Sequence, residues 1–454
     1  MNSQALTALV DDGSIDTVIV CMVDMQGRLV GKRFHARFFL DSGGTTHACD
    51  YLLANDITME PVPGYTAASW ERGYGDFELR PDLATLRLVP WLEATALVLC
   101  DVVDHHGELV SHSPRAVLQN ALRQLAEENL SAKCASELEF YLFEEPHGDI
   151  AARDFRAPAL AGHYIEDYHI LQTSREEPLM RQIRNGLHAA GIAVENTKGE
   201  WGPGQAEINV VYDAALSMAD KHVVLKNGIK EMAALQGKAV TFMAKWRDDL
   251  AGNSCHIHLS LWDVLGAANL SFAPEEKHGL SRVMQHFIAG LLRHAREVCY
   301  LLAPNINSYK RFQAGTFAPT TCAWSMDNRT AGFRLVGLGT ASVRIECRIG
   351  GGDLNPYLAY AALISAGLAG IKEKLALPDP LEGDAYAATG DKQQLPALPT
   401  TLREALDEFA ASTMLRQALG DAVVEHYVHA GRWEQAQHDA QVTDWEVRRG
   451  LEQA

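Results

Sequence analysis

The chain has 454 residues, of which 47% are hydrophobic, and this size predicts two domains with a sizeable core. Its formal net charge of -18 argues against nucleic acid as a partner, because binding along a phosphate backbone requires a basic surface. The longest nearly apolar run, residues 357–371, is shorter than the about 20 residues that span a membrane. No secretory signal is recognisable, and the eight cysteines form no Cys-x-x-Cys pair. We therefore expect a cytoplasmic protein with reduced thiols and no membrane contact.

The first hundred residues have a strand-rich pattern. Two apolar, β-branched runs in residues 17–34 are split by Gln26-Gly27, which predicts a hairpin. Residues 95–110 repeat this pattern, with a turn at His106-Gly107. Between them, residues 60–82 are rich in glycine, proline and aromatic residues and predict a long ordered loop, a type of segment that is often functional.

Strands and helices alternate after a boundary near Ser113-Pro114. Helical spacing of apolar residues begins at Pro114 and predicts a helix there. Further helices are predicted over 177–191, 213–236, 287–302 and 355–371, and strands over 133–145, 204–212, 239–246, 254–262 and 341–350. The last hundred residues are predicted to be helical and are more charged.

Glu137 and Glu139 are the first candidate site residues. Strand side chains repeat every two residues, so both carboxylates are expected on one face. Two acids at this spacing also occur on solvated strand faces. Here the neighbouring CAS and FYLF segments are apolar, so the acids should project from a buried strand, where a carboxylate needs a partner such as a metal ion.

Further acids, imidazoles and arginines extend this pattern along the chain. Two histidines in a strand also fit a hydrogen-bonded core, but His256, His258 and Ser260 are predicted to share one face. Carboxylates and a histidine suit Mg²⁺ or Mn²⁺, and arginine forks grip phosphate and carboxylate groups. The combination predicts ATP-dependent phosphoryl chemistry. The remaining members are Glu200 and Glu207 in KGEWGPGQAEINV, Glu346 in RIECR, and Arg311, Arg329, Arg334, Arg344 and Arg348.

At this point the sequence resembles the glutamine synthetase family. The resemblance rests on SELEFYLF, GPGQAEINV, TFMAK, SCHIHLSL, PNINSYKRF, APTTCAWSMDNRTAGFR, RIECR and NPYLAYAALISAGL, which occur in family order along nearly the whole chain. It implies an α+β fold in which an N-terminal β-grasp domain, residues 1–106, precedes a catalytic domain, residues 107–454. That catalytic domain is a split β-barrel with surrounding helices. Family protomers assemble as two stacked rings, commonly a dodecamer.

The resemblance also implies roles for individual residues, with ATP and glutamate as substrates and two or three Mg²⁺ or Mn²⁺ ions as cofactors. One metal ion is expected at Glu139, Glu200 and Glu207, and another at Glu137, His256 and Glu346. The expected ATP-binding residues are His258, Ser260, Arg334 and Arg344, the expected glutamate-binding residues are Gly252, Arg311 and Arg348, and Arg329 and Arg334 are expected to face the phosphates as catalytic residues.

One loop departs from the family pattern. Glutamine-forming members carry a glutamate in a G-x-E-A-P context, whereas this chain has Phe317 between Gly315 and Pro319. The family's D-G-S-S segment is not recognisable either, although Asp50 and Asp56 lie nearby. Because anionic groups that attract ammonium are lost, Phe317 is predicted to line an amine pocket that offers apolar and cation–π contact.

The resulting prediction is an ATP-dependent ligase that joins the glutamate γ-carboxylate to an organic amine through γ-glutamyl phosphate. An ethanolamine-like monoamine is favoured over a polyamine, because no acid cluster for a second ammonium group stands out in the loops. The alternatives are ordinary glutamine synthesis from ammonium and a catalytically silent relative, which the intact metal positions argue against. Residues 391–399 contain no tyrosine, so control by adenylylation is predicted to be absent.

Overall fold

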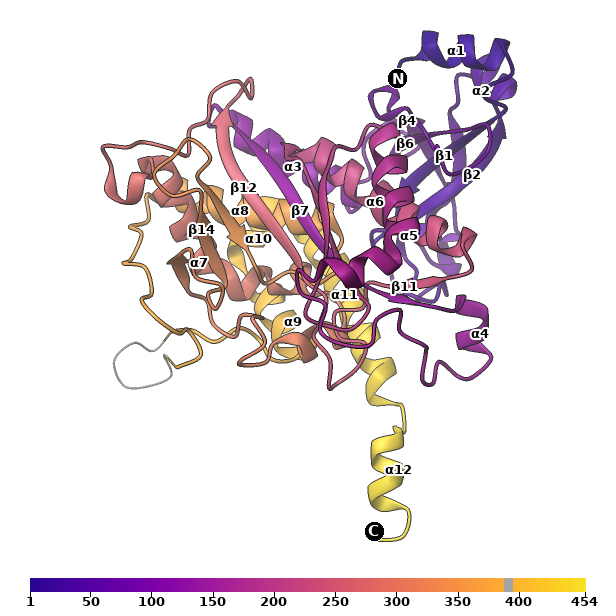
Figure 1. Cartoon of the computed structure of the whole chain (residues 1–454). Helices are drawn as coiled ribbons and strands as arrows, with labels where there is room; N and C mark the ends of the chain where they lie inside the picture. Colours follow the sequence, from indigo (N-terminus) through magenta and orange to yellow (C-terminus); the bar gives the residue numbers. More distant parts are fainter. Residues whose placement is uncertain (388–394) are drawn as a thin grey trace.

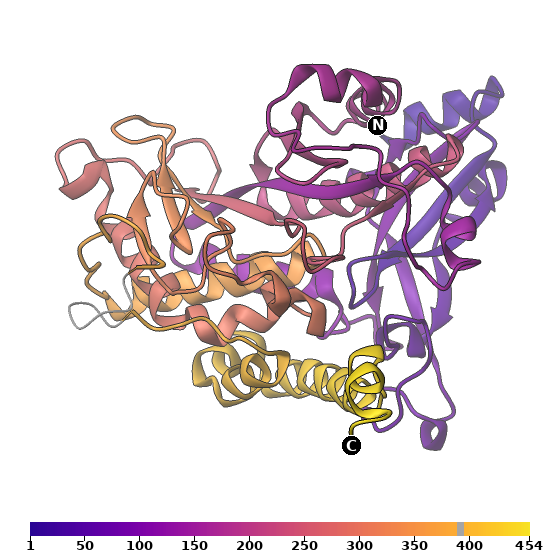
Figure 2. The ribbon, with the colours of Figure 1, turned by 60° about the horizontal axis from the view of Figure 1, so that its bottom comes forward.

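The computed structural model describes residues 1–387 and 395–454 and contains two sheets surrounded by helices (Figures 1 and 2). The predicted α+β class is confirmed. The segment proposed to lack adenylylation begins at residue 391, so its first four residues lie outside the described part of the chain. Within that part, no helix is long and apolar enough to cross a bilayer.

The smaller sheet lies to one side of the molecule (Figure 1) and has the strand order β2-β1-β6-β4-β3, with β5 also paired to β6. The first two strands form the predicted antiparallel hairpin, and β1 runs parallel to β6. Gly27 has a φ of 78°, which the hairpin turn requires and glycine readily adopts. The elements are α1 (Ser3–Asp11), β1 (Thr17–Val23), β2 (Leu29–His35), α2 (Ala36–Ser42), β3 (Thr46–Cys49), η1 (Asp50–Leu53), η2 (Trp70–Arg72), β4 (Asp76–Pro81), η3 (Leu83–Thr85), β5 (Arg87–Leu88) and β6 (Thr95–Val103).

Two expectations for this region were wrong in part. The predicted loop over 60–82 ends in strand β4, which pairs with β3 and β6; Phe77 and Leu79 alternate with less buried residues, and their side chains are buried on one face of the sheet. The second predicted hairpin has no full return strand, only a single bridge between Val103 and Leu109. The proposed domain boundary between residues 106 and 107 falls inside this turn and stays a prediction.

The larger sheet forms the centre of the molecule, with the strand order β13-β14-β15-β12-β7-β9-β8 and with β10 and β11 also paired to β7. Its longest strand, β7, runs antiparallel to both β9 and β12. The strands are β7 (Leu130–Phe143), β8 (Val194–Gly199), β9 (Gln205–Val210), β10 (Asp213–Ala214), β11 (Ala239–Thr241), β12 (Cys255–Asp263), β13 (Trp324–Met326), β14 (Phe333–Val336) and β15 (Arg344–Cys347).

The predicted strand over 239–246 is wrong beyond Thr241. Asn253 donates hydrogen bonds to the carbonyls of Thr241 (3.3 Å) and Met243 (2.9 Å), and Asn307 accepts one from the Lys245 amide. These side-chain amides replace a neighbouring strand as hydrogen-bond partners, so the segment continues as an ordered loop.

Helices pack against one face of the larger sheet (Figure 2). Helix α8 is buried along nearly its whole length and crosses α7 closely at Gly290, where a Cβ atom would lie 2.2 Å from the Ala366 carbonyl. The elements are α3 (Pro114–Glu127), α4 (His147–Ala151), α5 (Ile170–Ala189), α6 (Ala215–Leu235), η4 (Lys277–Gly279), α7 (Arg282–Leu302), η5 (Ile306–Arg311), α8 (Pro356–Glu373), α9 (Leu402–Ala411), α10 (Thr413–Leu419), α11 (Asp421–Asp439) and α12 (Asp444–Gly450).

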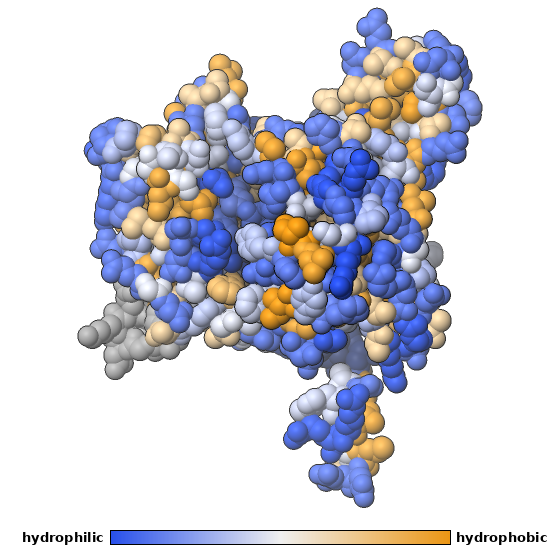
Figure 3. Space-filling model, in the orientation of Figure 1, coloured by the Kyte–Doolittle hydropathy of each residue, from blue (hydrophilic) through white to orange (hydrophobic). Residues whose placement is uncertain are grey.

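Buried polar contacts join the two sheets. Asn355 caps helix α8 and donates hydrogen bonds to the carbonyls of Asp24 and Met25, both at 3.1 Å. Arg115 at the start of α3 forms ion pairs with acids from both regions, including Asp82 at 2.6 Å and Asp220 at 3.0 Å. Helix α12 projects away from this body, and its polar and apolar side chains are both exposed (Figures 1 and 3).

Candidate active site

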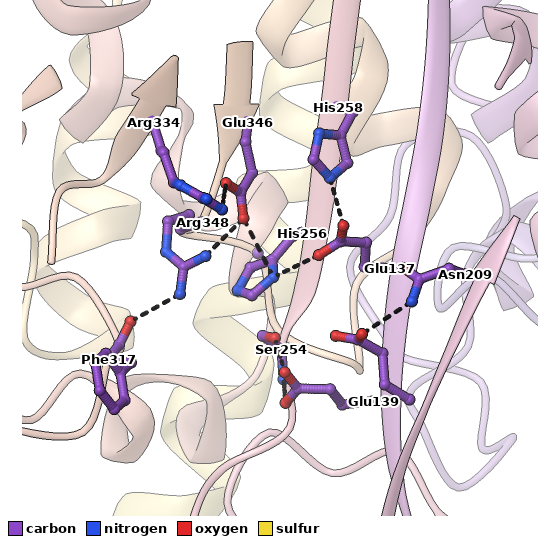
Figure 4. A network of polar contacts seen from close by, with 12 residues as sticks. Glu137, Glu139, Asn209, Ser254, His256, His258, Phe317, Arg334, Glu346 and Arg348 are labelled. Atoms are coloured by element: carbon purple, nitrogen blue, oxygen red, sulfur yellow. Dashed lines mark hydrogen bonds and ion pairs between the residues drawn. The ribbon is translucent and has the colours of Figure 1, made fainter. Parts of the chain in front are cut away.

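Four strands of the larger sheet bring the predicted acids and histidines together (Figure 4). In the strand register, Glu137 on β7 lies opposite His256 on β12, and Glu139 lies opposite Glu207 on β9. On the other side of β12, His258 is paired with Glu346 on β15. The predicted common face of Glu137 and Glu139 is confirmed, while Leu138 between them is buried in the core.

Glu137, His256 and Glu346 form the first group of converging side chains, here called the Glu346 group. One ligand atom from each lies within 4.8 Å of the other two. His256 Nδ1 is 3.1 Å from Glu137 Oε2 and 3.5 Å from Glu346 Oε1. Burial acts to raise the pKa of Glu137, but hydrogen bonds from His256 and His258 lower it. Its carboxylate is therefore held ionised.

The imidazole of His258 has a defined proton position. Its Nδ1 accepts a hydrogen bond from Arg344 Nε at 3.2 Å, and an arginine can only donate. The ring proton of a neutral His258 therefore lies on Nε2, which is 2.8 Å from Glu137 Oε1. This places Arg344 and His258 next to the Glu346 group.

Glu139 and Glu207 belong to a second group, here called the Glu207 group, which shares His256 with the first. Burial and then Glu139 raise the pKa of Glu207 to about 7. Burial also raises the pKa of Glu139, and the charge of Glu200 raises it further. The acids of the Glu346 group have histidine and arginine neighbours, whereas the nearest charged neighbours of these acids are mostly other carboxylates.

Glu200 is near this second group but has a competing partner. Lys198 Nζ contacts the Glu200 carboxylate, lies 3.6 Å from Glu207 Oε1, and is 4.6 Å from the centre of the Tyr168 ring. Burial and then Glu207 raise the pKa of Glu200 to about 7. Lys198 was not among the predicted site residues, although its position two residues before Glu200 at the end of β8 predicts that both face the same way.

Glu139 also has neutral hydrogen-bond donors that the sequence analysis did not identify. The Ser254 amide donates to Glu139 Oε2 at 2.7 Å, and its hydroxyl donates to Oε1 at 2.6 Å. Gln205 Nε2 is 3.3 Å from the same Oε2. Ser254 directly precedes β12 and Gln205 begins β9, so only the strand register reveals that they face Glu139.

Two of the predicted arginines converge on Glu346 (Figure 4). Arg348 lies 2.6 Å from Glu346 Oε1, and Arg334 lies 3.0 Å from Oε2. Burial acts to raise the pKa of Glu346, but His256 and Arg348 lower it. Arg329 is different, because its side chain is exposed in the loop between β13 and β14. The structure therefore does not bring Arg329 into this cluster.

Arg311 and Gly252, both predicted to bind glutamate, lie in direct contact. The buried Arg311 guanidinium donates hydrogen bonds to backbone carbonyls, including Gly350 at 3.0 Å. A Cβ atom on residue 252 would lie 2.6 Å from Arg311 Cγ and 2.5 Å from the Ala244 carbonyl. Glycine is therefore required at 252 for this close approach.

Phe317 lies on the loop that follows η5, at the edge of the arginine cluster. Its side chain is 52% exposed and its φ is 58°, a left-handed conformation that is uncommon for a bulky residue. Its carbonyl is 3.4 Å from Arg348 Nη2, which links this loop to Glu346. The backbone thus positions Phe317 beside the site.

Ser260 lies further along β12, on the same side as His256 and His258. Its hydroxyl accepts a hydrogen bond from Trp262 Nε1 at 2.9 Å. The Trp262 ring stacks near Tyr212, with centroids 6.2 Å apart, and Lys133 Nζ lies 3.6 Å from its centre. The predicted ATP-binding residues His258 and Ser260 therefore border a flat aromatic surface.

The donor set fits divalent cations. Each group contains two carboxylates and the shared His256 imidazole within 4.8 Å, an oxygen-rich set that suits Mg²⁺ or Mn²⁺. The pKa of Glu200 and Glu207 is raised by burial and then by clustered negative charge, and a cation would relieve the second of these. Glu139, Glu200 and Glu207 would hold one ion, and Glu137, His256 and Glu346 a second; these roles stay predictions.

Comparison with known proteins identifies similar chains. Residues 111–450 match the family model of the glutamine synthetase catalytic domain. The chain is 49% identical over 451 residues to γ-glutamylethanolamide synthetase of Streptomyces coelicolor, covering 99% of this chain and 95% of that protein. It is 39% identical over 447 residues to glutamate–isopropylamine ligase of a Pseudomonas species, covering 98% and 96%. A ligand-free structure of GmaS superposes with a TM-score of 0.85 at 29% identity, covering 98% of this chain and 99% of that one.

Proposed function

Because the chain belongs to the glutamine synthetase family, we propose that it is an ATP-dependent ligase of glutamate and an organic amine. It joins the glutamate γ-carboxylate to the amine through γ-glutamyl phosphate and releases ADP and phosphate. The favoured amine is a small monoamine such as ethanolamine. Support comes from the names of two relatives, a γ-glutamylethanolamide synthetase and a glutamate–isopropylamine ligase.

One residue, Arg348, carries this proposal structurally. It lies 2.6 Å from Glu346 of the proposed metal site and 3.4 Å from the carbonyl of Phe317 on the proposed amine loop. The Arg348 guanidinium thus connects the proposed metal and phosphate site with the proposed amine-binding loop. Glutamate bound at Arg348 and Arg311 would place its γ-carboxylate between the proposed metal site and the proposed amine-binding loop.

The protein residues contribute mainly position and charge. When bound at the two acid groups, Mg²⁺ or Mn²⁺ ions neutralise phosphate charge and polarise the transferred phosphoryl group. His258, Ser260 and Arg344 hold the nucleotide in this proposal, and Arg334 faces its phosphates. Arg334 is fixed for this by its contact with Glu346, and Arg329, which is exposed, is proposed to face the phosphates as well.

Phe317 determines amine selectivity in this proposal. A phenyl ring cannot accept a proton or attract ammonium by net charge, but it offers apolar contact to an alkyl amine and a π face to its cationic head. The ring is half exposed, so a substrate can reach it. Ammonium, which has no carbon chain, gains only part of this contact.

The test is phosphate release with ATP, Mg²⁺ and glutamate across a panel of amines, with product masses determined. The panel comprises ammonium, ethanolamine, isopropylamine, aniline, putrescine and spermine. We expect the highest kcat/KM with ethanolamine or another monoamine. Dominant turnover with ammonium would instead indicate a glutamine synthetase that tolerates Phe317, and dominant turnover with putrescine or spermine would indicate a polyamine ligase.

Family membership also motivates a proposal about assembly and location. We expect two stacked rings of protomers, a dodecamer, in the cytoplasm. Light scattering on the purified chain measures the mass of the assembly directly, and a monomeric mass under assay conditions would contradict the ring.

A further inference from the structure

A second cavity lies apart from the proposed active site. It has a volume of about 1100 Å³ and is bounded by the β1–β2 turn, helix α6 and helix α11. Its walls include Arg28, Lys226, Lys230 and Trp433. None of the residues predicted to bind metal, ATP, glutamate or the amine lines this cavity. Its size suits a small-molecule ligand.

Several buried polar atoms on its walls have no hydrogen-bond partner among residues 1–387 and 395–454. Asn55 is only 3% exposed, and neither its amide nitrogen nor its amide oxygen is paired. Asp353 Oδ1 and Trp433 Nε1, also on the lining, are unpaired as well. Buried polar groups in proteins are nearly always satisfied, so several unpaired atoms on one cavity indicate a site built for a polar ligand.

Two lysines lie close together on the lining, which also includes the acids Asp56, Asp353 and Glu434. The ammonium groups of Lys226 and Lys230 lie 5.3 and 5.8 Å from the centre of the same Phe242 ring. Lys226 donates a hydrogen bond to the Gly352 carbonyl at 2.7 Å, and within the described chain neither lysine forms a salt bridge. Burial and then the charge of Lys230 lower the pKa of Lys226 to about 8. An anion between the two would remove this repulsion.

We propose that this cavity binds a small organic anion whose carboxylate or phosphate group lies between Lys226 and Lys230. The Asn55 amide, which offers both a donor and an acceptor, contacts the polar remainder of the ligand. The site is distinct from the proposed catalytic site and does not depend on which amine the enzyme uses.

Hydrogen bonds connect this cavity with the Glu207 group. Lys226 binds the Gly352 carbonyl, and the Gly352 amide donates to the Asn253 carbonyl at 3.0 Å. The Asn253 side-chain oxygen accepts from Gln205 at 2.9 Å, and the same Gln205 nitrogen is 3.3 Å from Glu139. An anion that attracts Lys226 would therefore affect Gly352 and Asn253, which are hydrogen-bonded, through Gln205, to the proposed metal site.

Isothermal titration calorimetry tests the proposal with the purified full-length chain. Sodium sulfate, succinate and glycerol phosphate are titrated at constant ionic strength into the wild type and into Lys230→Met, Lys226→Met, Lys372→Met and Arg334→Met. We expect binding of at least one anion, weakened about tenfold or more by either cavity substitution. Lys372 is exposed and lies outside the cavity, so its variant controls for the change in net charge.

Arg334→Met controls for anions that bind at the proposed phosphate position, and it should leave the cavity affinity unchanged. The proposal is wrong if no anion binds the wild type, if Lys230→Met binds as tightly as the wild type, or if only Arg334→Met loses binding. Lys230 forms no hydrogen bond within the described chain and is an exposed residue, so its variant is expected to fold even if Lys226→Met does not. Comparing succinate with glycerol phosphate distinguishes a carboxylate from a phosphate ligand.

Discussion

Glu346 and Glu207 are both buried on the larger sheet, but their surroundings shift the pKa of the two carboxyls in opposite directions. Glu346 contacts two guanidiniums, at 2.6 and 3.0 Å, and these hold it ionised. Glu207 is flanked by further carboxylates, and among the described residues its one ion-pair partner is Lys198, at 3.6 Å. The difference shows that burial alone does not decide the charge of a site acid: the side chains across neighbouring strands do.

The largest effect is expected from Glu346→Ala, which removes the negative partner of Arg334, Arg348 and His256 at once. Two guanidiniums then lose their counter-charge, and catalysis should fall about a thousandfold or more, together with loss of one Mn²⁺ from the binding stoichiometry. Calorimetric Mn²⁺ titration and phosphate release measure both. Glu346→Gln keeps the shape and serves as the control for packing; unchanged metal stoichiometry in the alanine variant would refute the assignment.

A change of pH should separate the two groups. Glu200 and Glu207 have pKa values of about 7 in the metal-free protein, so below that pH they are protonated and must release protons to bind a cation. We expect Mn²⁺ affinity at the Glu207 group to fall about tenfold or more between pH 8 and pH 6. The two carboxylates of the Glu346 group have lowered pKa values and stay ionised over this interval, so affinity there should fall less steeply. Titrations at pH 6, 7 and 8 measure this; parallel loss at both groups would contradict it.

The same shifts predict how the stability of the metal-free protein depends on pH. A carboxyl with a raised folded-state pKa binds more protons when folded than when unfolded, between its unfolded pKa near 4.5 and its folded pKa near 7. Stability should therefore decrease as pH rises across this interval. Urea unfolding at pH 5 and pH 7 in chelator tests the sign, and saturating Mn²⁺ should reverse it.

Lys198→Met tests whether the lone cation of the Glu207 group competes with metal ions. Its ammonium contacts Glu200 and lies near Glu207, so removing it should tighten Mn²⁺ binding there by about tenfold and leave the Glu346 group unaffected. Lys198→Arg retains the charge and is the matched control. Weaker binding in the methionine variant would mean that Lys198 orients the carboxylates instead of competing for them.

The smallest effect on folding and metal binding is expected from Phe317→Glu, because Phe317 belongs to neither the Glu346 group nor the Glu207 group. Its side chain is 52% exposed, so the charge is tolerated, and a carboxylate should raise the ratio of kcat/KM for ammonium over ethanolamine about fivefold. Parallel assays with both amines measure the ratio, and Phe317→Gln controls for size without charge. No gain with ammonium would show that the loop does not determine specificity.

Features set by residues close together in the chain were predicted correctly from the sequence. The spacing of Glu137 and Glu139 on an apolar strand predicted their common face, and the hairpin around Gln26-Gly27 formed as expected. These features depend on residues close in the chain. Strand β4 was missed because its short alternation of Phe77 and Leu79 lies inside a segment rich in turn-forming residues. Lys198 was missed although it lies only two residues before Glu200; its second neighbour, Glu207, depends on the pairing of β8 with β9.

The sequence by itself determined the class of chemistry: which residue types are present, their spacing within each strand, and the resemblance to one family over nearly the whole length. Only the tertiary structure decided which of them meet. The register of β7 against β9 and β12 places Glu139 opposite Glu207 and Glu137 opposite His256. The physical reason is that strand pairing joins residues far apart in the chain, and charge interactions act over a few ångströms in space, not along the sequence.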